Sequence, residues 1–128
     1  MEMKKVVRTK NAPNPVGPYN QAIISGNFIF TAGQIALLPE SGQLEENDIR
    51  KQTERVIKNM EAVLIAAGSD LTRVVKTTVF LKNMNDFSSM NEVYGKFFTS
   101  DPPARSAVEV SRLPKDVLVE IECVAVVK

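Results

Sequence analysis

The sequence predicts an α+β fold in which about six strands form a mixed sheet and two helices cover one of its faces. Two segments have apolar residues at helical spacing, over residues 48–67 and from Asp86 onward. β-Branched runs flank both segments, and stretches rich in glycine and proline separate the elements. The chain has the length of one ordinary domain, so we expect residues 1–128 to form a single domain.

The first part of the chain predicts three short strands and one irregular loop. Residues 6–9 indicate a strand, whereas the run NAPNPVGP at residues 11–18 contains three prolines and a glycine, which exclude regular structure. We expect an ordered loop or a lid there. The run AIISGNFIF then predicts a hairpin around Ser25-Gly26-Asn27, because glycine and asparagine tolerate the positive φ of tight turns.

The first helix is predicted over residues 48–67, with Gly68 as its C-terminal cap. Its apolar positions recur every three or four residues, at Ile49, Val56, Met60, Val63, Leu64 and Ala67. The β-branched run Val74–Leu81 predicts the next strand. The order strand, helix, strand indicates a crossover connection.

The second helix is predicted to begin at Asp86 and to end before the run SDPP. Its apolar side is formed by Phe87, Met90, Tyr94, Phe97 and Phe98. Residues 104–110 and 117–127 predict the last two strands. We expect a turn between these strands, because Pro114 interrupts strand pairing.

The final strand is apolar on both faces. One face carries Val119, Ile121, Cys123, Ala125 and Val127, and the other carries Leu118, Val124 and Val126. Two helices cover only one face, so we expect the second to pack against another copy of the chain, as a homo-oligomer. Glu120 and Glu122 share this second face, either as rim charges or partners of an arginine such as Arg112, or as site carboxylates.

Composition excludes several classes of site and partner. The chain has no histidine and one cysteine, Cys123, so the common zinc sites, Ser/His and Cys/His centres and an internal disulfide are excluded. The formal net charge is +1 and the charges are mixed, which argues against a nucleic-acid partner on electrostatic grounds. No apolar run has the length of a signal peptide or of a membrane span, so we expect a cytoplasmic protein. Since the usual ligand residues are missing, we also expect no cofactor or metal.

Arg105 is the first candidate for ligand binding. It follows Pro102-Pro103, which stiffens the approach to the strand, and a planar guanidinium held in a restrained position suits a small carboxylate. The alternative is an ordinary surface arginine at the end of a loop. Tyr19 and Asn91 have comparable alternatives, as a loop anchor and as a solvated helix residue.

The run PARSAVEVSRLPKDVLVEI, from Pro103 to Ile121, resembles the signature of the Rid family, the reactive intermediate deaminases also called YjgF-like proteins. The signature positions are Arg105, Val108, Leu113, Val119, Glu120 and Ile121. Similar segments cover nearly the whole chain: NAPNPVGPYNQA, FTAGQI, AAGSDLTRVVKTTVFL and MNDFSSMNEVYGKFF. The presence of both Arg105 and Glu120 makes the chain similar to the RidA-type enamine/imine deaminases.

The resemblance implies a chorismate-mutase-like fold and a homotrimer with ligand clefts between subunits. It implies the activity of a 2-iminobutanoate/2-iminopropanoate deaminase, which hydrolyses imines released by pyridoxal-phosphate enzymes to 2-oxo acids and ammonia. By this resemblance Arg105 holds the substrate carboxylate and Glu120 positions and activates water. Four further positions line the family's cleft, here Tyr19, Gly33, Asn91 and Ala107. Many members have a cysteine at the position of Ala107, so no thiol role is expected here.

The residues also make such a site chemically plausible. A protonated imine is already an electrophile, so an enzyme needs to supply only orientation and one proton acceptor. Two other classes of function stay open at this point: a regulator that binds small carboxylates such as 2-oxo acids without turnover, and a chaperone or RNA-acting factor. Chorismate mutase activity rests on fold analogy alone.

Overall fold

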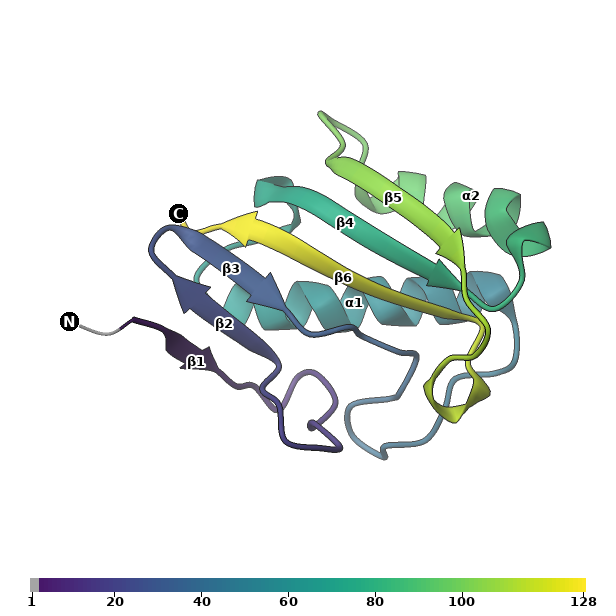
Figure 1. Ribbon diagram of the computed structural model, residues 1–128, viewed down its shortest axis with the longest axis horizontal. Coiled ribbons are helices and arrows are strands. Elements are labelled where there is room, and N and C mark those ends of the chain that lie inside the picture. The colour runs from purple at the N-terminus through teal and green to yellow at the C-terminus, as the bar shows by residue number, and fades with distance from the viewer. Residues whose placement is uncertain (1–2) are drawn as a thin grey trace.

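The computed structural model describes residues 3–128, whose strands form one mixed sheet with the order β1-β2-β3-β6-β4-β5 (Figure 1). The strands are β1 (Lys5–Val7), β2 (Ala22–Ser25), β3 (Phe28–Thr31), β4 (Val74–Leu81), β5 (Ala104–Glu109) and β6 (Val119–Val126). Only β4 and β5 pair in parallel, and the other neighbours are antiparallel. The predicted six-stranded mixed sheet is confirmed.

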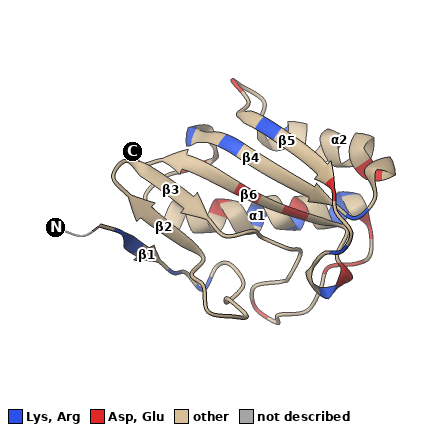
Figure 2. Cartoon of the chain, in the orientation of Figure 1, with Lys and Arg blue, Asp and Glu red and all other residues tan. Residues whose placement is uncertain are grey.

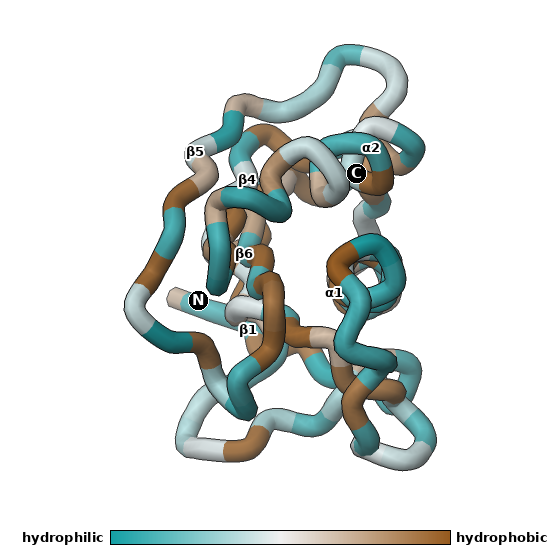
Figure 3. Tube along the Cα trace, turned by 90° about the vertical axis from the view of Figure 1, so that its right-hand side faces the viewer, coloured by the Kyte–Doolittle hydropathy of each residue, from teal (hydrophilic) through white to brown (hydrophobic). Residues whose placement is uncertain are grey.

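The two helices, α1 (Ile49–Ala66) and α2 (Phe87–Phe97), lie on the same side of the sheet (Figure 3). Three short 3₁₀ helices connect the elements: η1 (Leu71–Arg73), η2 (Met84–Asp86) and η3 (Pro114–Asp116). The predicted α+β class, with two helices on one face, is therefore correct.

Several predicted boundaries differ by one or two residues from those observed. Asp86 closes the turn η2, so α2 begins one residue later than predicted. The last strand begins at Val119 because Pro114–Asp116 forms a 3₁₀ turn in which Lys115 and Asp116 both have a φ of 55°. In the hairpin between β2 and β3, Gly26 alone of the two turn residues has a positive φ, of 61°.

Helix α1 begins and ends as the sequence predicts. The Asp48 carboxylate accepts a hydrogen bond of 2.9 Å from the backbone N–H of Lys51, which caps the first turn. Gly68 follows the helix with a φ of 80°, and the N–H of Ser69 donates to the carbonyl of Leu64 at 2.9 Å. A residue in the left-handed region at this point satisfies carbonyls that the helix leaves free.

The core lies between the helices and the sheet. Its largest fully buried side chains include Ile29, Ile57, Met60, Leu64, Leu81, Met90 and Ile121. Cys123 belongs to this cluster, and burial raises the pKa of its thiol to about 12. The sulfur is therefore a neutral core group, as expected from the sequence.

The other face of the sheet, called here the open face, carries no helix among residues 3–128 (Figure 3). Val119 and Ile121 are fully buried on the helix side, whereas Glu120 and Glu122 alternate with them and so belong to the open face. The same face exposes large apolar side chains: Val6, Phe28, Phe30 and Val108. The predicted division of the last strand into two faces is confirmed.

Alanine substitutions at two glycines should change the free energy of unfolding in opposite directions, because the backbone conformations of the two residues differ. We expect Gly68→Ala to lower the free energy of unfolding by about 1 kcal/mol, because alanine is strained at positive φ and gains no contact there. We expect Gly95→Ala to raise it by about 0.5 to 1 kcal/mol, because Gly95 lies inside α2 with open space around its Cα. Urea denaturation of both variants measures the two changes, and a shift of the same sign in both would contradict this account.

Candidate functional site

Arg105 lies on the edge strand β5 and points toward α2. Its strand partner Thr77 is fully buried on the helix side, which places the Arg105 side chain on that side as well. The guanidinium carbon lies 4.8 Å from the centroid of the Tyr94 ring and 5.4 Å from that of Phe87. Its Nη1 donates a hydrogen bond of 2.7 Å to Oδ1 of Asn91. Arg105 and Asn91, both predicted as site residues, are thus in direct contact.

The three partners of Arg105 come from one side of α2. Phe87, Asn91 and Tyr94 are separated by four and three residues, which brings them onto the same face of a helix. The Tyr94 hydroxyl shares a buried hydrogen bond of 2.7 Å with Oγ1 of Thr77. Sequence reasoning assigned both aromatic residues to the core and missed their contact with Arg105, although the spacing around Asn91 contains the signal.

The Arg105–Asn91 contact determines which hydrogen bonds remain available. A guanidinium only donates, so Asn91 must present its oxygen, and the amide NH₂ stays available as a donor. The remaining N–H groups of Arg105 can form a bidentate pair with a carboxylate. Among residues 3–128, no aspartate or glutamate forms an ion pair with Arg105.

Glu120 lies half-buried on the open face, directly over Gly33. A Cβ on residue 33 would lie 2.8 Å from Cδ of Glu120 and closer still to Oε2, so only glycine leaves room for this carboxylate. Burial, and secondly the charge of the exposed Glu122, raises the pKa of Glu120 above its usual value. A carboxylate with a raised pKa is a better proton acceptor near neutral pH.

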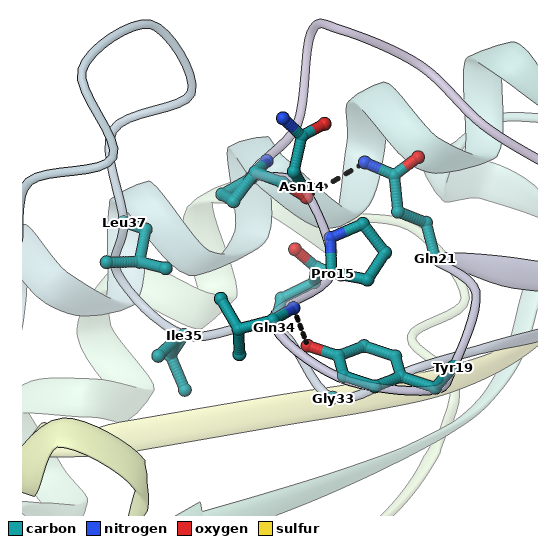
Figure 4. Close-up of a pocket in the computed structure, with 10 residues that line it drawn as sticks. Asn14, Pro15, Tyr19, Gln21, Gly33, Gln34, Ile35 and Leu37 are labelled. Carbon is teal, nitrogen blue, oxygen red and sulfur yellow. Dashed lines mark hydrogen bonds between the residues drawn. The ribbon is translucent and has the colours of Figure 1, made fainter.

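Tyr19 and Gly33 line one small pocket, together with Pro13, Asn14, Pro15, Val16, Gln21, Gln34, Ile35 and Leu37 (Figure 4). The Tyr19 hydroxyl accepts a hydrogen bond of 3.3 Å from the N–H of Val16, and the residue as a whole is 47% exposed. The pocket has a volume of about 30 Å³, which is enough for water but not for a four-carbon acid.

The loop that forms one wall of this pocket is held in place by Gln21. The side chain of this buried residue donates to the carbonyls of Thr9, Ala12 and Pro13 at 2.9 to 3.3 Å. Its Oε1 accepts from the N–H of Thr9 at 2.7 Å. The loop predicted at residues 11–18 is therefore irregular and also fixed. The Gln21 amide binds two backbone groups of Thr9, just before the loop, and the carbonyls of Ala12 and Pro13 within it.

Five of the six predicted site residues fall into two groups on opposite faces of the sheet, and Tyr19 lies in the loop beside Gly33. Arg105, Asn91 and Ala107 lie on the helix side, where Ala107 is half-buried against the core. Gly33 and Glu120 lie on the open face. Strand β4 separates β5 from β6, and Arg105 lies level with Cys123, three residues along β6 from Glu120. The backbones of Arg105 and Glu120 are therefore about 14 Å apart. Within one chain, these two side chains point away from each other.

Two kinds of feature are missing from the part of the chain that the structure describes. No three His, Cys, Asp or Glu side chains between residues 3 and 128 lie close enough to hold a metal ion. Over the same residues, neither helix has the length and apolar character needed to cross a membrane.

The sequence model of the family described as Endoribonuclease L-PSP matches residues 9–127. The 2-iminobutanoate/2-iminopropanoate deaminase of Homo sapiens is 44% identical over 124 residues, which cover 97% of this chain and 90% of that protein. This chain belongs to the Rid family. A RutC family protein of Pyrococcus horikoshii is 58% identical over 96% of this chain and 98% of its own length. The resemblance found in the sequence is therefore correct.

One of the solved structures similar to this chain contains a bound ligand. E. coli TdcF with bound serine superimposes with a TM-score of 0.93 at 41% identity, covering 97% of this chain and 99% of that chain. That relative binds a small molecule with a carboxylate, and other Rid relatives are named deaminases.

The contact between Gly33 and Glu120 can be tested by titration. We expect Gly33→Ala to displace the Glu120 carboxyl toward solvent and so to move its pKa down toward the usual value. Because the atoms in the way are the end of a flexible, half-buried side chain, the free energy of unfolding should change by less than about 1 kcal/mol. Carbon-detected NMR titration of the glutamate carboxyls measures the first effect.

Gly17→Ala is the control for this titration. A Cβ there would lie 3.6 Å from the Tyr19 ring, an ordinary contact, so the titration of Glu120 should not change. The same Glu120 midpoint in Gly33→Ala and in the control would contradict the packing described for Gly33.

Proposed function

We propose that this Rid protein is a deaminase that hydrolyses 2-imino acids and their enamine tautomers to 2-oxo acids and ammonia. The observation that carries the proposal is the Arg105 guanidinium, which two aromatic rings and Asn91 hold beside α2 without an acidic partner among residues 3–128. A fixed planar cation with free N–H donors suits the carboxylate that every 2-imino acid carries. We propose 2-iminobutanoate and 2-iminopropanoate as substrates, since a relative 44% identical is named for them.

The proposed reaction needs one proton acceptor. Water attacks C2 of the protonated imine, the C=N electron pair moves to nitrogen, and Glu120 takes the proton that the water loses. Glu120 then returns that proton to nitrogen, which makes ammonia the leaving group. As the C–N bond breaks, the carbinol hydroxyl gives its own proton to Glu120, so the 2-oxo acid and ammonia form and Glu120 afterwards releases the proton to solvent. The raised pKa of Glu120 supports this role, because it brings the carboxyl nearer to the pH at which these transfers occur. No step uses a thiol, a metal or a cofactor, in agreement with Ala107 at the position next but one to Arg105.

We further propose that the complete site lies between two copies of the chain, in a homotrimer. Arg105 and Glu120 lie on opposite faces of the sheet, so a small ligand can contact both only if a second copy supplies one of them. Phe28 and Phe30 on the open face are 46% and 47% exposed, which supports burial against another copy. Tyr19, Gly33 and Asn91 would then line the same cleft.

A small-molecule partner is favoured over a polyanion. Lysines and arginines are interspersed with acids along the strands and helices (Figure 2), and the formal net charge is only +1. Binding to nucleic-acid phosphates requires clustered basic side chains.

We place the reaction in the cytoplasm and assign residues 1–128 to one catalytic domain.

The activity itself is tested with imine generated in place by a threonine dehydratase acting on threonine. The protein should accelerate loss of 2-iminobutanoate over buffer, with 2-oxobutanoate and ammonia as products. Arg105→Ala should lower the rate about a hundredfold or more, because the carboxylate loses its partner. Arg73→Ala removes an exposed cation from η1 and is the matched control, with an unchanged rate.

Folded wild-type protein that gives no acceleration would refute the deaminase. Binding of 2-oxobutanoate without turnover would then favour a carboxylate-sensing regulator. Full activity of Arg105→Ala would refute the carboxylate clamp but not the reaction.

The position of the site between copies is tested by mixing two inactive variants. Arg105→Ala and Glu120→Gln are refolded together from denaturant in equal amounts. If one copy supplies Arg105 and its neighbour supplies Glu120, random assembly should make about one quarter of the sites complete. About a quarter of wild-type activity is therefore expected, and a mixture no more active than its components would overturn the shared site.

A further inference from the structure

We infer that Tyr94 and Phe87 are positioning residues that hold the Arg105 guanidinium where it meets the substrate carboxylate. The inference rests on the proposed function and extends it to residues that do not touch the substrate themselves. It starts from the observation that the Arg105 side chain contacts two rings and one amide of α2.

The contacts of Arg105 divide the guanidinium into a held part and a free part. The guanidinium carbon lies 4.8 Å from the Tyr94 ring centroid and 5.4 Å from that of Phe87, both within the range of cation–π attraction. The hydrogen bond to Asn91 uses one of the five N–H groups. The cation therefore lies over both aromatic rings, and the other N–H groups stay free to donate.

Tyr94 can act as a fixed support because the residue is buried and two contacts determine its own position. The residue is 6% exposed, and its hydroxyl is bound to the fully buried Thr77 at 2.7 Å. The Phe98 ring lies behind it with centroids 4.6 Å apart. Burial raises the pKa of the Tyr94 hydroxyl, so the phenol stays neutral and its ring presents an ordinary π face to Arg105.

The arrangement also explains why the cation needs to be supported at all. Arg105 lies on an edge strand, where only β4 pairs with its backbone, and an arginine side chain has about 2 kcal/mol of rotamer entropy to lose on binding. Rings that hold the free side chain near its bound geometry reduce this cost before the ligand arrives. The effect should therefore appear in affinity for the carboxylate rather than in the chemical step.

The decisive variants remove the ring or only its hydroxyl. Tyr94→Leu should raise the KM for 2-iminobutanoate, and the Kd for 2-oxobutanoate measured by calorimetry, about tenfold, within the two- to thirtyfold range expected for cation–π contacts. The kcat should change less than twofold. Tyr94→Phe keeps the π face and should restore KM to within about twofold of wild type, although the Thr77 hydrogen bond is lost.

A double-mutant cycle separates positioning from a general loss of structure. If Tyr94 acts through Arg105, Tyr94→Leu should have no further effect on the Kd for 2-oxobutanoate once Arg105 is alanine. Phe87→Leu tests the same support at a half-buried position, and carries the test if Tyr94→Leu fails to fold. It should raise the Kd two- to fivefold with an unchanged melting temperature.

Unchanged KM and Kd in folded Tyr94→Leu and Phe87→Leu would overturn the inference. The inference would also be overturned if Tyr94→Leu weakened 2-oxobutanoate binding equally in the presence of Arg105 and in Arg105→Ala. Either result, obtained while wild type deaminates and Arg105→Ala does not, would leave the proposed function intact. Absence of turnover and of 2-oxobutanoate binding in wild type would instead overturn the function on which the inference rests.

Discussion

The two-residue period of β6 is the constraint on which both the fold and the site depend. One set of side chains, from Val119 to Ala125, is buried against α1 and completes the core. The alternate set begins with Glu120 and belongs to the open face. A shift of one residue in register would expose the core set and bury two carboxylates, so the packing that stabilises the sheet also fixes where the proposed base lies.

Local patterns predicted the elements well because their causes are local. The helical spacing before Gly68, the hairpin at Gly26 and the strand Val74–Leu81 each depend on neighbouring residues. The position of β6 between β3 and β4 depends on long-range pairing, which periodicity does not encode. The late start of β6 has a local cause, the 3₁₀ turn at Pro114–Asp116, but its two residues with positive φ are not glycines and so gave no signal.

The candidate site was recognisable as a set of residues but not as an arrangement. Arg105 and Glu120 stood out because a restrained arginine and carboxylates within an apolar strand require explanation. Their separation onto opposite faces follows from the pairing of β5 with β4, and this was not visible in the sequence. The aromatic neighbours of Arg105 were assigned correctly to the packed side of α2, yet one side of a ring can pack in the core while the other supports a cation.

The central place of the last strand has a consequence for how the protein is made. The strands β1, β2 and β3 pair with one another, as do β4 and β5, but only β6 joins the two sets. In chain order β6 follows the other five strands, so until it emerges from the ribosome the nascent chain holds two separate sheet pieces with unpaired edges. Closure of the sheet and arrival of the Glu120 carboxylate therefore happen in one step, and a chain that stops before β6 would lack both.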